Sequence, residues 1–324
     1  MIGKLAGFEF LRFYFMIWIC LIHIWTPFSI SHGSIGVDFF FMSAGFFLFQ
    51  HFEKEPMAVY PYAKKRFHRL YPVYIIGIIL GYGLLIFDLL KDGEAVSPIM
   101  MAESFLTDSL MIQGLGWFSH PYSGNAVSWF VSVLFIASIL LYASLRYNQR
   151  LTVNLLIPFF CIVYYAAHGT LEETTTLGRG LAGLSLGVLL AKISPDLRES
   201  AIRTKNALNI LSVLAFVLLS LYIVWIEECF DSFAIVLYVP LIAACSIQGS
   251  WLNRLFNHRI WLFLGGITYE MLMMQIPCRF IINYGYDHFP FHRSLWIVAY
   301  LLLTILSAWL LKTVLSSITR PAVR

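Results

Sequence analysis

Charged residues are scarce in this 324-residue chain. Asp, Glu, Lys and Arg together make up 12% of it, about half the fraction that is usual in a soluble domain. Hydrophobic residues make up 59%, and the mean hydropathy is +0.76. The scarcity of charge excludes an ordinary soluble protein and indicates a chain that is integral to a membrane.

The sequence also lacks cysteine pairs and metal-ligand patterns. The five cysteines are scattered, mostly in apolar segments, and none has a Cys-x-x-Cys spacing. We therefore predict that they are small packing residues. We expect no metal, no permanently bound cofactor and no nucleic-acid partner. The cysteines are Cys20, Cys161, Cys229, Cys245 and Cys278.

Long polar segments and a cleavable leader are missing as well. No stretch is long and polar enough to form a soluble domain, so we expect one membrane-embedded domain over residues 1–324. The first apolar stretch, 5–25, is too long for the h-region of a signal peptide and has no small-residue cleavage site. It is therefore expected to remain as a membrane span.

Long hydrophobic runs, by contrast, are abundant. Ten segments have roughly the 17–25 residues that a bilayer core requires, and they predict an all-α polytopic membrane helix bundle with about ten transmembrane helices. Pro277 interrupts the ninth segment, and 104–115 is expected to be an interfacial or re-entrant helix. The segments are 5–27, 35–52, 70–90, 127–145, 151–168, 177–193, 206–226, 232–249, 259–282 and 294–316.

The basic residues predict an orientation for these spans. With the N-terminus inside, 17 of the 22 Lys and Arg residues fall in inner segments and four in outer ones. Such an asymmetry follows the positive-inside rule and predicts cytoplasmic termini at both ends, hence an even number of spans. We expect a multi-pass protein of the bacterial inner (plasma) membrane. The four outer residues are Lys91, Arg179, Arg279 and Arg293.

Arg12 and His23 stand out inside the first apolar run. A charged Arg within a membrane span is costly and is by default a functional hypothesis. At about 100° per residue, eleven positions return almost to the starting direction, so a continuous helix places both side chains on one face. Glu9 falls on that face one turn before Arg12 and forms either part of the site or a structural ion pair.

Two other places hold charges with possible chemical roles. Asp38 lies in the second span and Glu270 in the ninth. Arg66 and Arg69 precede the third span, three residues apart, so a helix puts their guanidinium groups side by side. Paired guanidinium groups suit a phosphate, although such a pair taken alone is more often an anchor that contacts lipid headgroups.

The order of these residues resembles the acyltransferase-3 family of integral-membrane O-acyltransferases. Its first-span Arg-x10-His pattern matches Arg12 and His23. Its Gly-Val-Asp-Leu-Phe-Phe-like run ending in Ser-Gly-Phe is similar to residues 36–46, including Asp38. Its Arg-x-x-Arg-Leu-Tyr-Pro-like motif matches Arg66 to Pro72, including Tyr71.

The resemblance implies transfer of an acyl group, most often acetyl, from acetyl-CoA or another acyl-CoA to a hydroxyl of a glycan or a lipid-linked saccharide. His23 would be the general base, with Asp38 orienting it or pairing with Arg12. Arg12, held by Glu9, would position the donor or stabilise the oxyanion. Arg66, Arg69 and Tyr71 would bind the CoA end. On the outer side, Asn125, Trp129 and Arg179 would contact the acceptor, although a Trp at a span end is commonly an interfacial anchor.

Two departures from the family pattern indicate a divergent branch, which we expect to lack the fused extracytoplasmic domain of other members. Many members have a Ser-Val-Glu-Glu segment in the fourth span, where Leu134 stands here. Many have a His before the Pro of the ninth span, where Gln275 stands here. The Arg–His pattern itself is unaffected.

Two questions stay open at the level of sequence. CoA is cytoplasmic, whereas His23 is expected in the outer half of the membrane. Either the pantetheine arm reaches His23 between the helices, or His23 is acylated and passes the group outward. A transporter or flippase of a glycan precursor is the competing class, because ten spans with buried charges suit it too. A structural scaffold does not account for Arg12 and His23.

Overall fold

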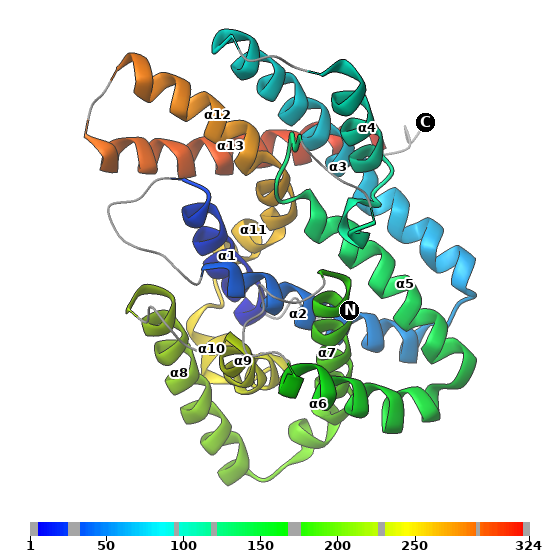
Figure 1. Ribbon diagram of the computed structural model, residues 1–324. Helices are drawn as coiled ribbons and strands as arrows, with labels where there is room; N and C mark the ends of the chain where they lie inside the picture. Colours follow the sequence, from blue (N-terminus) through cyan, green and yellow to red (C-terminus); the bar gives the residue numbers. More distant parts are fainter. Residues whose placement is uncertain are drawn as a thin grey trace, which may run out of the picture. The chain divides into compact units, whose positions relative to one another are not determined.

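The computed structural model confirms the all-α fold class. It describes residues 6–24, 33–93, 97–117, 122–167, 176–225, 231–289 and 292–319, and in these ranges it contains helices and no strand (Figure 1). The α-helices are α1 Ala6–Ile22, α2 Gly36–Lys54, α3 Val59–Lys91, α4 Pro98–Ser109, α5 Ser128–Leu151, α6 Ile157–Ala167, α7 Thr176–Glu199, α8 Ile202–Trp225, α9 Asp231–Ser246, α10 Trp251–Leu255, α11 Arg259–Gly266, α12 Thr268–His288 and α13 Arg293–Thr319.

Six stretches of helix in the described ranges are long and apolar enough, by length and composition, to cross a membrane. Helices of this kind indicate an integral membrane protein. The ten-span count stays a prediction, since α1, α6 and α9 have 17, 11 and 16 residues. The six are Gly33–Lys54, Val59–Lys91, Ser128–Ala166, Thr176–Glu199, Ile202–Trp225 and Arg293–Ile318.

The break in the ninth predicted span lies elsewhere than expected. We expected Pro277 to interrupt it, but α12 runs through Pro277 and the helices separate at Ile267, between α11 and α12. Proline has no N–H and leaves the carbonyl four residues earlier without its helical partner. Here the Nδ2 of Asn125 donates to that carbonyl, Met273 O, at 2.9 Å, which removes the main cost of the proline.

The other boundaries also have local causes. The segment 104–115, expected as one interfacial or re-entrant helix, falls partly in α4, which ends at Ser109, and partly in a 3₁₀ turn at Gln113–Leu115. The helix α4 begins at Pro98 because Ser97 caps its N-terminus and Pro98 stands at its first turn. The fourth and fifth spans are separated by Asn148, whose backbone is non-helical (φ −152°, ψ 90°) and whose Oδ1 accepts from the N–H of Leu151. A π-helical stretch, Thr152–Leu156, then leads into α6.

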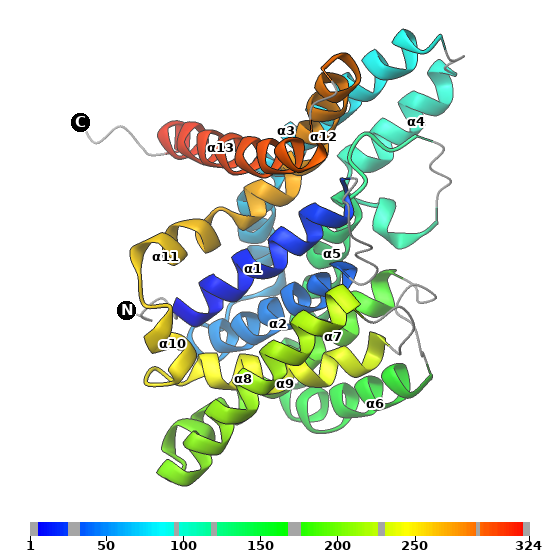
Figure 2. The ribbon, with the colours of Figure 1, turned by 90° about the vertical axis from the view of Figure 1, so that its left-hand side faces the viewer.

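Contacts divide the chain into two compact units. The first comprises Met1–Ile19, Phe28–Ala63 and Ile136–Gly266, and the second comprises Cys20–Pro27, Lys64–Phe135 and Ile267–Arg324. In the first unit α2 lies against α7 and α8 lies along α9 (Figure 2). In the second unit α12 and α13 are neighbours (Figure 1).

Glycines allow α2 and α7 to approach at backbone distance. A Cβ on Gly45 would lie 1.9 Å from the carbonyl oxygen of Leu184, and one on Gly187 would lie 2.0 Å from that of Met42. Any larger side chain would therefore separate the helices. Four cysteines are buried and free, as predicted, and Cys229 lies outside the described residues.

Asp108, outside the candidate spans in α4 of the second unit, is buried with 3% of its surface exposed. Its Oδ2 accepts a hydrogen bond from the Tyr82 hydroxyl at 2.8 Å, and its carbonyl oxygen accepts from Tyr74 at 2.5 Å. Burial raises the pKa of Asp108 from 3.8 to about 6, and the hydrogen bond from Tyr82 opposes that rise.

This shift predicts a pH dependence of stability. The pKa of Asp108 is higher in the folded than in the unfolded chain, so the folded state holds the extra proton between about pH 4 and pH 6. The stabilisation by the protonated carboxyl is full below about pH 4 and is lost as the pH rises through about 6. Relative to Asp108→Asn, the wild type should lose about 3 kcal/mol across that window, at about 1.4 kcal/mol per pKa unit.

The measurement is thermal unfolding of the detergent-purified protein between pH 4 and pH 7. Asp92→Asn, at an exposed position after α3, should follow the wild type across the range. Identical pH profiles for the wild type and Asp108→Asn would contradict the expectation.

Candidate functional site

Glu9 and Arg12 form an ion pair on α1 in the first unit. The Nη1 of Arg12 lies 3.1 Å from the Oε1 of Glu9, one helical turn away, as the i, i+3 spacing predicts. The Arg12 guanidinium also lies over the ring of Phe47, 5.1 Å from its centroid. Gly265 of α11 packs on this turn, since a Cβ there would lie 2.3 Å from the carbonyl oxygen of Glu9. The guanidinium is therefore held in one place by charge, ring and packing.

Asp38 and Arg179 form a second and more buried pair in the same unit. The Nε of Arg179 donates to Oδ1 of Asp38 at 3.0 Å, and its Nη2 donates to Oδ2 at 2.7 Å. Nη2 also donates to the carbonyl oxygen of Ser34 at 3.1 Å. Exposure is 0% for Asp38 and 7% for Arg179. Two parallel bonds to one carboxylate are the strongest arrangement available to this pair.

This pairing changes the expected environment of Asp38. We expected Asp38 to orient His23 or to pair with Arg12, and we expected Arg179 to contact the acceptor. The structure instead joins Asp38 to Arg179, from α2 and α7, at the ends of these helices that the charge pattern places outside.

His23, in the second unit, lies in the turn that closes α1. The helix ends at Ile22, although the predicted span continued to residue 27, and residues 25–27 lie outside the described part. The N–H of His23 donates to the carbonyl of Cys20 at 3.1 Å, so the last turn tightens, and the eleven-position argument from an ideal helix holds only approximately here. The Nη1 of Arg279 in α12 donates to the carbonyl oxygen of His23 at 3.5 Å. The imidazole is partly exposed.

Arg66, Arg69 and Tyr71 all lie on α3 in the second unit, as the motif spacing predicts. Arg66 is half-buried and Arg69 is exposed. The ring of Tyr71 stacks on Phe67 with centroids 4.5 Å apart. Their role towards a ligand stays a prediction.

Asn125 and Trp129 stand near the start of α5 in the second unit. Asn125 is fully buried, and its Nδ2 donates to the carbonyl oxygens of Gly77 in α3 and Met273 in α12. Its amide nitrogen therefore ties two helices together, while its Oδ1 is buried with no hydrogen bond among the described residues. Trp129 is half-exposed.

The comparison with known proteins identifies the family. A family model described as an acyltransferase domain, that of the acyltransferase-3 family, matches residues 5–313. The chain belongs to the acyltransferase-3 family. It is therefore a membrane acyltransferase, and the resemblance seen in the motifs is confirmed. No curated protein and no solved structure matches it significantly.

Within this acyltransferase the predicted residues are divided between the two units. Glu9, Arg12, Asp38 and Arg179 belong to the first unit, and the remaining six belong to the second. Sequence reasoning missed Arg279, which we counted only as an outer charge. Its signal was present, because an Arg within the ninth apolar segment is as costly there as Arg12 is in the first.

Proposed function

We propose that this acyltransferase moves an acyl group, most simply acetyl, from cytoplasmic acyl-CoA to a hydroxyl of a cell-surface glycan or a lipid-linked saccharide precursor. The enzyme acts within the lipid bilayer, in a bacterial inner membrane, and needs no permanently bound cofactor. One observation carries the proposal: this acyltransferase domain has the Arg-x10-His pattern at Arg12 and His23, and Glu9 holds the Arg12 guanidinium.

His23 and Arg12 each have a separate task in the proposed reaction. His23 takes the proton of the acceptor hydroxyl as its oxygen attacks the thioester carbonyl carbon. The carbon–sulfur bond then breaks and the CoA thiolate leaves, and the proton held by His23 passes to the thiolate or to solvent, which restores the neutral imidazole. Arg12, fixed by Glu9, positions the acyl-CoA donor.

Asp38 has a structural task in this scheme. Its bidentate bond to Arg179 fixes the start of α2 against α7, which keeps the outer end of the first unit in one arrangement. Asn125 and Trp129 are proposed to line the acceptor side, with the buried Oδ1 of Asn125 as the available acceptor of a hydrogen bond from a sugar hydroxyl.

Membranes that contain the protein, incubated with radiolabelled acetyl-CoA, test the proposal. Label should enter the glycan or lipid-linked saccharide fraction, and membranes from cells without the gene should give none. The bond should be an ester, so mild alkali should release the label. Repeating the assay with succinyl-CoA identifies the acyl group. No labelled product with any donor or saccharide fraction would contradict the proposal.

A further inference from the structure

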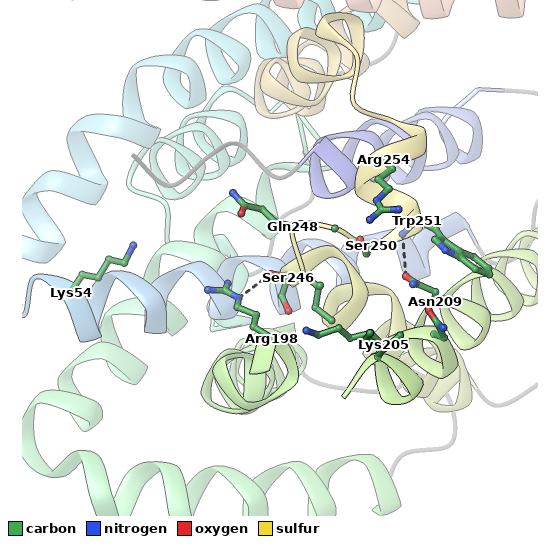
Figure 3. A pocket seen from close by; sticks show the side chains of 13 residues that line it. Lys54, Arg198, Lys205, Asn209, Ser246, Gln248, Ser250, Trp251 and Arg254 are labelled. Atoms are coloured by element: carbon green, nitrogen blue, oxygen red, sulfur yellow. Dashed lines mark hydrogen bonds between the residues drawn. The ribbon is translucent and has the colours of Figure 1, made fainter. Parts of the chain in front are cut away.

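A basic pocket of about 730 Å³ lies in the first unit, away from Arg12 and Asp38. Lys54 at the end of α2, Arg198 at the end of α7, Lys205 at the start of α8 and Arg254 of α10 line it from four elements (Figure 3). Residues 246–250, from the end of α9 to the residue before α10, also line it. We call it the basic pocket below.

The charges of the basic pocket are all of one sign. No carboxylate lines it, and within the described ranges none of its four cations forms a salt bridge. Like charges gathered from four elements repel one another, and an anion in the recess relieves that repulsion. Asparagine, glutamine and serine side chains add neutral hydrogen-bonding groups to the same wall.

The wall is fixed before a ligand arrives. The Nε of Arg198 donates to the carbonyl oxygen of Ser246 at 3.0 Å, which aims the guanidinium at the recess (Figure 3). Asn209, 7% exposed, accepts from the N–H of Trp251 at 3.1 Å. Buried Asn253 donates to the carbonyls of Cys245 and Ile247 at 2.8 and 2.7 Å. A site held by such contacts loses little entropy when an anion binds.

Size and composition favour a nucleotide over a lipid headgroup. The volume lies within the range of about 300–1,000 Å³ typical of small-molecule sites. Nine of the 13 residues that line the pocket have polar or charged side chains, and the apolar side chains among them are those of Ile202, Ile247 and Trp251. Trp251, 46% exposed at the rim, presents a ring on which a base can stack. The helix ends that form the pocket are the ones that the charge pattern places in the cytoplasm, where acyl-CoA occurs.

We propose that the basic pocket binds the phosphate groups of a nucleotide, namely the 3′-phosphorylated adenosine diphosphate end of the acyl-CoA donor. This inference rests on the proposed function for the identity of the ligand. It assigns the phosphates to Lys54, Arg198, Lys205 and Arg254, whereas the motif reading assigned them to Arg66 and Arg69.

Direct binding tests the site without relying on transfer. The purified full-length protein in detergent is titrated calorimetrically with adenosine 3′,5′-bisphosphate and with desulfo-CoA. Lys205→Gln/Arg254→Gln should weaken binding of both at least tenfold and should reduce the dependence of affinity on salt. The matched control, Arg146→Gln/Arg150→Gln, removes two exposed cations of α5 on the same predicted face and should stay within twofold of the wild type.

Three results would overturn the proposal. The first is an absence of nucleotide binding in the wild type. The second is loss of binding in Arg66→Gln/Arg69→Gln together with wild-type affinity in the pocket variant. The third is a pocket variant that loses association with phosphatidylglycerol vesicles but keeps its affinity for nucleotide, which would assign the pocket to lipid headgroups. Unfolding midpoints equal to that of the wild type in all variants would show that a loss of binding does not result from a loss of folding.

The transfer assay separates this proposal from the proposed function. If the pocket variant has a raised KM for acetyl-CoA and an unchanged kcat, the proposed function and the nucleotide site are both supported. If nucleotide binds in the pocket but no acyl group is transferred, the proposed function fails while the site stands. If transfer proceeds with an unchanged KM in the pocket variant, the site alone fails.

Discussion

Acyl transfer should fall by about 100-fold or more in His23→Ala, while the amount of protein in the membrane stays normal. Loss of a general base lowers a rate by about 10²- to 10⁴-fold, because the attacking hydroxyl keeps its proton. The fold should survive, because the imidazole is partly exposed and the main chain of His23 keeps its hydrogen bonds with Cys20 and Arg279. The measurement is transfer of label from acetyl-CoA, normalised to the amount of protein.

The matched control is His292→Ala, which removes an exposed imidazole just before α13. It should transfer label at the wild-type rate. Wild-type activity in His23→Ala would remove His23 from the reaction.

The same variant separates the two routes that the sequence leaves open. If His23 only accepts the proton, rapidly quenched wild-type protein carries no label in the absence of acceptor, and the variant keeps slow transfer. If His23 carries the acyl group, the quenched wild type is labelled on His23, and the variant transfers nothing.

Arg179→Met should destabilise the protein by about 3–5 kcal/mol, the cost of removing one partner from a buried ion pair. The change leaves the carboxylate of Asp38, with 0% exposure, without the two parallel donors that now hold it. Arg179→Lys should be less harmful but still destabilising, since a lysine retains the charge and cannot make both bonds. Thermal unfolding of the detergent-purified protein measures the differences.

A double variant separates the contribution of the ion pair to stability from that of side-chain packing. Asp38→Leu/Arg179→Met removes both charges and should recover most of the stability lost in the single variant. Arg203→Met, at an exposed position of α8, should change stability by no more than about 0.5 kcal/mol. A single variant as stable as the wild type, or a double variant as unstable as the single one, would contradict the assignment.

Much of the fold follows from the sequence because the cause is local. A bilayer fixes the length of an apolar run, so the ten predicted spans each correspond to helix in the described ranges. Ser97 and Pro98 start α4 through groups within one turn. The prediction at Pro277 was wrong because the carbonyl freed by proline is satisfied from another part of the chain, by Asn125.

In the candidate site, too, the sequence predicted the features that have a local cause. One helical turn joins Glu9 to Arg12, so the sequence alone determined that pair and, with the motifs, the acyltransferase family. Asp38 and Arg179 are 141 positions apart, and the basic pocket draws its cations from four helix ends. Helical periodicity relates residues only along one helix, whereas close packing at Gly45 and Gly187 determines which helices become neighbours. Only the tertiary structure could therefore decide that Asp38 meets Arg179 and that Lys54, Arg198, Lys205 and Arg254 surround one recess.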